Sequence, residues 1–213
     1  RTTQNLIRHT LAFARKPEIE ELPRYFRQQL AKTELSYRRI FNAASQQISE
    51  EQLKEAVLQK KQQLKLFFAI YLFSSRPKYR KLNSTLQKDV RLHFGSMKEL
   101  EAKAKDLLYS LGENELIYSD IQKAVDDRLG YSDGDKFTFN ARNLNKIPLR
   151  LRGIMSVAER LSGKIDDVDL IKIHIETKKV SYLSIDKFGS SPLPRVLGRT
   201  IVDFRDNKIA TFE

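Results

Sequence analysis

The sequence predicts an α+β protein that is predominantly helical, with tandem helix-turn-helix-like repeats followed by a helix and a small antiparallel sheet of two hairpins. Three observations predict this class. Helix-capping signals punctuate the chain from its start to Gly130. After Gly163 the spacing of apolar residues changes from a helical to a strand-like period. The first half of the chain also resembles itself when Lys16 is aligned with Arg76.

Helix starts are marked by serines followed three residues later by Gln or Glu, the pattern of the capping box. The pairs are Ser49 with Gln52, Ser84 with Gln87, and Ser96 with Glu99. Helix ends are marked by glycines, which accept the left-handed cap conformation: Gly95, Gly112, Gly130 and Gly163. Together these signals predict helices over 3–15, 22–31, 34–47, 50–73, 85–93, 97–111, 115–129 and 149–162.

The residues after 163 predict two hairpins in one antiparallel sheet, because β-rich runs are separated by short polar turns. The runs are 168–175, 180–185, 200–204 and 208–212, and Phe137 and Phe139 suggest a further short strand. Ile171, Ile173 and Ile175 alternate with Lys172 and His174, so the isoleucines should face a core and the other two should face outward. The same alternation places Tyr182 opposite in facing to Ser181 and Leu183.

The internal repeat aligns Lys16-Pro17 with Arg76-Pro77. It also aligns Phe13 with Phe73, Leu22 with Leu82, Ser36 with Ser96, Arg38 with Lys98, Ile40 with Leu100, and Ala44 with Ala104. The shared unit is an apolar helix, a basic-Pro loop, a short helix, a Ser-led turn and a third helix. We therefore predict a basic helical region over 1–112, with repeats at about 1–47 and 61–111, and a second region over 113–213. Chance similarity between amphipathic helices is the alternative.

Composition is typical of a globular protein, with 40% hydrophobic and 31% charged residues. The absence of cysteine excludes disulfides, thiolate zinc sites and a cysteine nucleophile, and suits the reducing cytoplasm that we expect as the location. The longest apolar run, Leu66–Phe73, has eight residues, whereas a bilayer span needs about 20. We therefore expect no membrane partner.

The excess of basic residues predicts a polyanionic partner. The net charge is +12, and residues 1–110 hold 22 basic and 11 acidic residues, whereas residues 111–213 hold 17 and 16. A basic helical repeat with helix-turn-helix character favours nucleic acid, most of all duplex DNA. A basic surface that serves only solubility is the alternative.

The loop from Arg76 to Lys81 is the sharpest candidate site, because its four cations can reach phosphates and Tyr79 can stack on a base or bond a phosphate. The alternative is a solvated loop whose tyrosine packs inward. The candidate nucleic-acid-binding residues are Arg76, Lys78, Tyr79, Arg80, Lys81, Lys88, Arg91, Lys98, Arg38 and Arg39.

The sequence contains no complete catalytic motif. His9, His93 and His174 lack metal-ligand spacing, and no glycine-rich phosphate loop is present. We therefore assign no catalytic residue, no metal and no cofactor. A weaker alternative is a metal-dependent nuclease that uses Glu176-Thr177-Lys178 with Asp166, Asp167 and Asp169. Charged residues at a hairpin turn explain Glu176 and Lys178 equally well.

From Lys16 onward the chain resembles the C-terminal region of the DNA phosphorothioation-associated methyltransferase family. The resemblance lies in Arg76–Tyr79, Leu86–Val90, Phe94–Lys98, Ile171–His174, Val180–Leu183, Pro192–Pro194 and Val202–Arg205. The Phe94-Gly95-Ser96 turn is also similar to a helical repeat found beside homing endonucleases. The chain departs from the family at Leu193, where Pro-His-Pro is usual, and at Ile185-Asp186-Lys187-Phe188, where the family has a Tyr-Pro-Asp-Phe-like run.

The resemblance implies a role in phosphorothioate-linked DNA modification or restriction, with other proteins of such a system as partners. The family's methyltransferase part precedes this region, so the resemblance assigns no catalytic residue here. We therefore expect an accessory module that binds duplex DNA. The alternative is a protein-interaction platform within a defence complex.

We predict that this chain alone binds no S-adenosylmethionine, because the glycine-rich turn that such a site usually needs is missing from its sequence. Isothermal titration should show no saturable heat when the cofactor is added at micromolar concentration. A saturable heat would contradict the prediction that this chain has no site for the cofactor.

Overall fold

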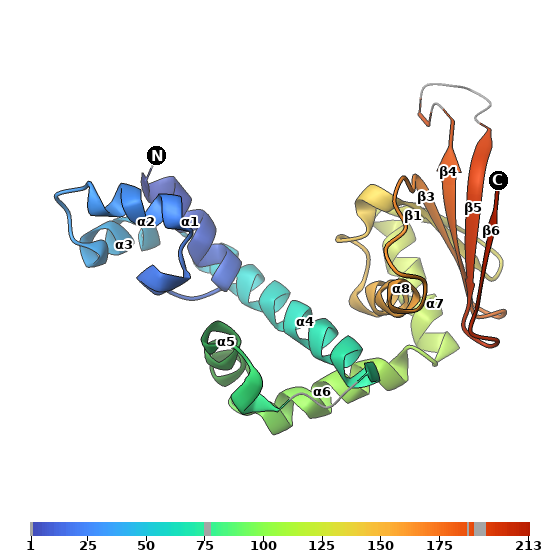
Figure 1. Cartoon of the computed structure of the whole chain (residues 1–213), viewed down its shortest axis with the longest axis horizontal. Helices are drawn as coiled ribbons and strands as arrows, with labels where there is room; N and C mark the ends of the chain where they lie inside the picture. Colours follow the sequence, from blue (N-terminus) through green and yellow to red (C-terminus); the bar gives the residue numbers. More distant parts are fainter. Residues whose placement is uncertain (1, 75–77, 187, 190–194) are drawn as a thin grey trace. The chain divides into compact units, whose positions relative to one another are not determined.

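The computed structural model describes residues 2–74, 78–186, 188–189 and 195–213. In this part of the chain, eight α-helices precede or flank one six-stranded antiparallel sheet (Figure 1), which confirms the predicted class. The helices are α1 (Thr2–Phe13), α2 (Arg24–Ala31), α3 (Tyr37–Ser45), α4 (Glu50–Ser74), α5 (Ser84–Phe94), α6 (Met97–Ser110), α7 (Asn114–Asp126) and α8 (Leu149–Ser162). Short 3-10 helices are η1 (Ile19–Glu21), η2 (Tyr79–Lys81) and η3 (Ala141–Asn143).

The chain divides into two compact units. Unit 1 consists of Arg1–Phe68 and Arg76–Ala102, and unit 2 consists of Ala69–Ser75 and Lys103–Glu213. The predicted boundary at residue 112 lies inside unit 2, where the end of α6 packs on α8. Arg150 of α8 donates a hydrogen bond to Ser110 (3.2 Å), and the α8 backbone at Gly153 lies against the Leu111 side chain. Among the described helices, none is both long and apolar enough to cross a membrane.

Helix starts follow the capping signals, with one difference. Ser49 and Gln52 form both bonds of the capping box, at 3.0 and 3.1 Å. Ser96 accepts a hydrogen bond from the Glu99 amide (3.1 Å) at the start of α6. The prediction that Ser84 caps α5 is wrong, because Asn83 takes this place and accepts from the Leu86 amide at 2.8 Å. Asn is at least as good an N-cap as Ser, so the helix begins after Asn83 rather than after Ser84.

The elements of the first half recur at a constant spacing. η1 and η2 begin at residues 19 and 79, α2 and α5 at 24 and 84, and α3 and α6 at 37 and 97. Leu22 and Leu82 follow the two 3-10 turns with nearly the same extended backbone. Ala44 and Ala104 are both fully buried at equivalent positions. The core of the first repeat is formed by Leu6, Leu22, Phe26, Ile40 and Ala44.

A buried ion network connects the two repeats within unit 1. The Arg15 guanidinium donates to both carboxylate oxygens of Glu21, at 2.6 and 2.7 Å, and its Nε donates to Asp89 of α5 at 2.8 Å. Lys60 of α4 lies 2.9 Å from the other oxygen of Asp89, which is fully buried. Lys88 of α5 also pairs with Glu18. This network, with two positive and two negative charges, therefore joins the segment that follows α1 to η1, α4 and α5.

Unit 2 is built on a meander of six antiparallel strands in sequence order. The strands are β1 (Gly130–Asp133), β2 (Lys136–Asn140), β3 (Leu170–His174), β4 (Lys179–Ile185), β5 (Val196–Asp203) and β6 (Lys208–Phe212). Both predicted hairpins are present, and β4 pairs with β5 to join them in one sheet. The sequence pattern at Phe137 and Phe139 predicted β2 but not β1, although the turn between them, Gly134-Asp135, is a common hairpin signal.

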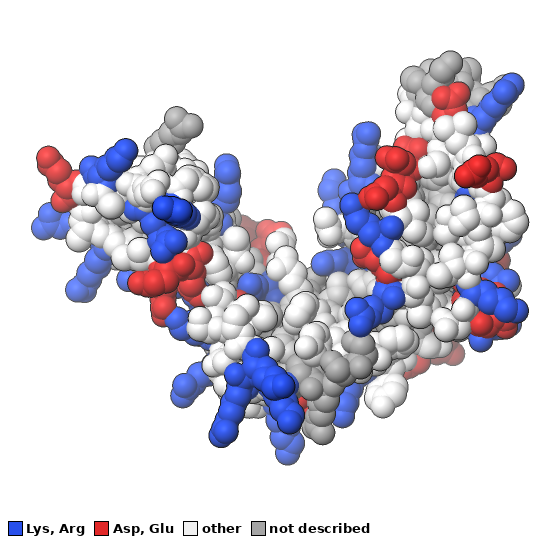
Figure 2. All heavy atoms as spheres, viewed as in Figure 1, with Lys and Arg blue, Asp and Glu red and all other residues white. Residues whose placement is uncertain are grey.

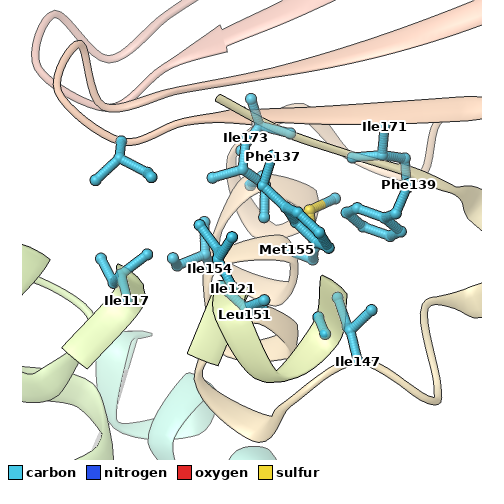
Figure 3. Close-up of a cluster of buried hydrophobic side chains, with 14 of the residues drawn as sticks. Ile117, Ile121, Phe137, Phe139, Ile147, Leu151, Ile154, Met155, Ile171 and Ile173 are labelled. Carbon is cyan, nitrogen blue, oxygen red and sulfur yellow. The ribbon is translucent and has the colours of Figure 1, made fainter. Parts of the chain in front are cut away.

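One face of the sheet packs against α7 and α8. Figure 3 shows the buried side chains of the two helices and the sheet meeting in one cluster. Ile171, Ile173 and Ile175 are 1–3% exposed, whereas Lys172 and His174 lie on the other face, which confirms the predicted register. β2 contributes Phe137 and Phe139 to this core, and their rings are stacked with centroids 5.4 Å apart.

Replacing Arg15 with Leu should lower the free energy of unfolding by about 3–5 kcal/mol, because it leaves the buried carboxylates of Glu21 and Asp89 without their shared cation. Urea unfolding followed by circular dichroism measures this change. Lys54→Ala removes a cation from an exposed i,i+4 pair and should change stability by less than about 0.5 kcal/mol. Similar losses in the two variants would contradict a structural role for the network.

Candidate nucleic-acid interface

The described part of the predicted basic loop, residues 78–81, contains the 3-10 turn η2 and leads into α5. Lys78, Arg80 and Lys81 are exposed, whereas Arg76 lies outside the described residues. The Lys81 amide donates to the Lys78 carbonyl (2.8 Å), and the Leu82 amide donates to Tyr79 (3.1 Å), so η2 presents its cations from a fixed backbone.

Tyr79 is placed differently from its neighbours in the loop. It is half-buried, and its hydroxyl donates to the backbone carbonyl of Gln87 (3.2 Å). In this position the tyrosine anchors the turn on α5, as in the alternative in which the aromatic packs inward. A role for Tyr79 in contacting a base or a phosphate stays a prediction.

The candidate cations of α5 and α6 differ in their availability. Arg91 and Lys98 are exposed, and Lys98 lies in the first turn of α6. Lys88 is partly buried and is engaged by Glu18. Figure 2 shows Lys and Arg side chains projecting from the part of unit 1 that contains α5 and the start of α6. Lys98 and Arg91 are therefore better placed than Lys88 to meet a ligand.

The first repeat presents cations at equivalent positions. Arg38 and Arg39 are exposed in the first turn of α3, and Arg38 is the second residue of α3 as Lys98 is of α6. The loop between α1 and η1 is held by Tyr37, whose hydroxyl donates to the Pro17 carbonyl (2.6 Å). Burial raises the pKa of Tyr37 to about 12, so this hydroxyl keeps its proton at neutral pH. Both repeats thus place an exposed cation at the start of their last helix.

The ion network gives unit 1 its surface charge indirectly. Arg15 and Lys60 neutralise Glu21 and Asp89 inside the unit, so the excess of basic residues belongs to exposed side chains. These four residues could not be predicted from the sequence, since no local pattern marks an ion pair between residues as distant in sequence as Arg15 and Asp89.

The candidate catalytic residues do not converge. Glu176 accepts hydrogen bonds from Asn114 (3.2 Å) and Tyr118 (2.9 Å), and Lys178 bonds Asn114, at the turn between β3 and β4. Asp166, Asp167 and Asp169 precede the opposite end of β3, about 17 Å away for a five-residue strand. Within the described residues, no group of three or more His, Asp or Glu side chains is arranged to hold a metal ion.

The histidines lie in three separate environments. The His9 ring packs 5.5 Å from the Phe26 ring, and His174 lies on the sheet. His93 is 8% exposed in α5, and its burial lowers its pKa below the usual value.

Parts of the family-like pattern can be located. Leu86–Val90 and Phe94–Lys98 lie in α5 and at the α5–α6 turn, and Ile171–His174 with Val180–Leu183 form the β3–β4 hairpin. Pro192-Leu193-Pro194 and Lys187 lie outside the described residues. Comparisons with known protein families, with curated proteins and with solved structures found no match.

Glu21 should make unit 1 sensitive to acid. The hydrogen bonds from Arg15 lower the pKa of Glu21 from 4.5 to about 2 despite its burial. A carboxylate whose pKa is lower in the folded state contributes stability above its unfolded pKa and loses that contribution as the pH falls through the folded pKa. Glu21→Gln should therefore destabilise the protein near pH 6, and this loss should shrink between pH 4.5 and pH 2.

Urea unfolding of wild type and variant at several pH values measures this dependence. Glu34→Gln is the matched control, because Glu34 is exposed in the loop before α3. A Glu21→Gln deficit that stays constant over this range would exclude the ion pair as its source.

Proposed function

We propose that unit 1 binds duplex DNA through the exposed cations of its two repeats. The observation that carries this proposal is the recurrence, in the second repeat as in the first, of a helix-turn-helix-like unit whose last helix begins with an exposed cation. In such units the second helix enters the major groove while flanking groups contact the backbone. α3 and α6 are the corresponding helices, with Arg38 and Lys98 in their first turns.

Electrostatics support a polyanion as the partner. Residues 60–105 contain 12 Lys and Arg and three acidic residues. One of those acids, Asp89, is buried in the ion network and compensates Arg15 and Lys60 rather than the surface. Exposed cations attract DNA through release of condensed counterions, which supplies most non-specific affinity.

The loop at η2 would contact phosphates rather than bases. Lys78, Arg80 and Lys81 surround a turn that leads directly into α5, and a helix N-terminus adds favourable N–H donors and a positive dipole end. Contacts of this kind position a protein on DNA without reading its sequence. Base reading would fall to α3 and α6.

The family resemblance supports a specific setting for this activity. We infer that the chain acts as an accessory module of a phosphorothioation-linked DNA modification or restriction system, and positions DNA for an enzymatic domain elsewhere. A comparison of plain and phosphorothioated duplexes of one sequence in the same binding assay tests this setting. Equal affinity for the two duplexes would remove phosphorothioate recognition from the proposal.

A second candidate function is a protein-interaction platform. α4 presents large apolar side chains at its surface, among them Leu58, Phe67 and Phe73, which are 57%, 47% and 51% exposed. Exposed apolar residues concentrated on one element are typical of interaction sites. A duplex-binding measurement separates the two functions, because only DNA binding should depend steeply on salt concentration.

The double variant Arg80→Ala/Lys81→Ala should weaken binding to all duplexes alike. Each phosphate contact contributes about −0.9 to the slope of log affinity against log salt, so the slope should flatten by up to about two units. Any sequence preference should survive, because these contacts do not read bases. Fluorescence anisotropy of a labelled duplex at several salt concentrations measures both quantities.

The matched control is Lys146→Ala/Lys164→Ala, which removes the same charge from exposed positions in unit 2. Circular dichroism should show that both variants stay folded, since exposed charges contribute little to stability. A folded Arg80/Lys81 variant that keeps the wild-type affinity and salt slope would show that the η2 turn does not contact DNA.

A further inference from the structure

The outer face of the unit 2 sheet carries a concentrated basic surface that the sequence does not reveal. α7 and α8 both lie on one side of the sheet (Figure 1), and they pack on Phe137, Ile173 and Val180. We call this the inner face. Side chains on alternate residues point to the other face. We call this other face the outer sheet face and define it by the two neighbouring cross-strand rows and Arg199 described next.

The first row consists of Asp133, Lys136, His174, Lys179, Asp203 and Lys208, in order across the six strands. The second row consists of Tyr131, Thr138, Lys172, Ser181, Ile201 and Ala210. Arg199 lies beside them, opposite Leu183. Five Lys and Arg and two Asp therefore share this face, and Lys179 pairs with Asp203 at 2.9 Å. Both acids lie away from the centre, on β1 and β5.

At the centre, three basic side chains surround one hydroxyl. The Arg199 Nη2 donates to Ser181 Oγ at 3.1 Å, and His174 Nε2 lies 3.2 Å from the same oxygen. Lys172 is directly opposite Ser181 in the β3–β4 ladder. Ser181 itself is fully buried, and its hydroxyl lies beneath the two side chains that bond it.

The hydrogen-bond donors at this centre outnumber the acceptors that surround them, and its positive charges are not matched by negative ones. The Arg199 Nε is buried without a hydrogen-bond partner, and among the described residues no carboxylate forms an ion pair with Lys172 or Arg199. Ser181 accepts from Arg199, so its own proton is available to His174 Nε2 when that ring is neutral.

The neutral form of His174 is the one that its surroundings favour. Burial lowers the pKa of His174, and the charges of Arg199 and Lys172 act in the same direction. The charge of Asp135 raises this pKa by less than either of these two cations lowers it, and Lys136 lowers it further. The neutral ring with Nε2 as acceptor carries its proton on Nδ1. Lys172, Arg199 and the ring are therefore three hydrogen-bond donors that share this face.

We propose that the outer sheet face binds nucleic-acid phosphates, with Lys172, His174 and Arg199 at its centre and Lys136 beside them. This inference rests on the proposed function, because it adds a second DNA contact in unit 2 to the one proposed in unit 1. Phosphate is favoured because each group offers several acceptor oxygens, and because Tyr131, which is 58% exposed, is the one aromatic residue in the two rows. A face that stacked bases would need aromatic side chains at its centre.

The double variant Lys136→Gln/Lys172→Gln tests this proposal without disturbing the hydrogen bonds of Ser181. It should weaken duplex binding and flatten the salt slope by up to about two units. Lys146→Gln/Lys164→Gln removes the same charge outside the sheet and should leave the slope near the wild-type value. Arg199→Gln, checked for folding by circular dichroism, should weaken binding as well.

A local readout complements the affinity measurement. Addition of the duplex should shift the NMR resonances of the His174 ring, assigned by comparison with His174→Gln, and the shift should shrink in the Lys136/Lys172 variant. If that variant matches its control while Arg80→Ala/Lys81→Ala still weakens binding, the inference is overturned and the proposed function stands. If the wild-type chain binds no duplex at all, both are overturned.

Discussion

The arrangement of unit 1 depends on the pairing of Arg15 with two carboxylates. Glu21 belongs to the 3-10 turn of the first repeat and Asp89 to α5 of the second, and one guanidinium binds both. A buried charge without its partner is costly, so loss of the guanidinium should destabilise the unit strongly. The helices that carry the candidate DNA-binding cations are therefore positioned by charges that take no part in binding.

Unit 2 depends on a different constraint, the strict alternation of a pleated sheet. Because α7 and α8 cover one face, register decides for every strand residue whether it joins the core or meets solvent. A shift of one residue in β3 would bury Lys172 and expose Ile173, and both changes would destabilise the folded unit. The same constraint that buries the isoleucines also gathers the lysines of four strands on the other side.

Most of the helices and strands could be predicted from the sequence because their signals are local. Ser49 with Gln52, the offset between η1 and η2, and the alternation of Ile171, Ile173 and Ile175 are all readable within a few residues or by direct self-comparison. The predicted cap of α5 was one residue too late because Asn83 and Ser84 are both good caps. β1 was not predicted, because it is a four-residue edge strand without a buried residue of its own.

The residues of the candidate site could be predicted from the sequence only in part. Exposed cations such as Arg80 and Lys98 could be named from charge density alone. The roles of Tyr79 and Lys88 could not, because their partners are the Gln87 carbonyl and the distant Glu18. Side-chain pairing between residues so far apart in sequence leaves no local trace, so charge counts overstate which cations are available.

The two halves of the chain show why net charge by segment is an incomplete guide to a binding surface. In unit 1 the sequence excess is large, and the internal network is neutral, so the excess reaches the surface. Residues 111–213 are almost balanced in sequence, with 17 basic and 16 acidic residues. Yet many of their acids lie at turns and helix ends, such as Asp126, Asp166 and Asp206, while Lys136, Lys172 and Arg199 share one sheet face. A ligand responds to the local field of that face rather than to the sum over the segment. Sheet register can therefore create a basic surface from a nearly neutral sequence.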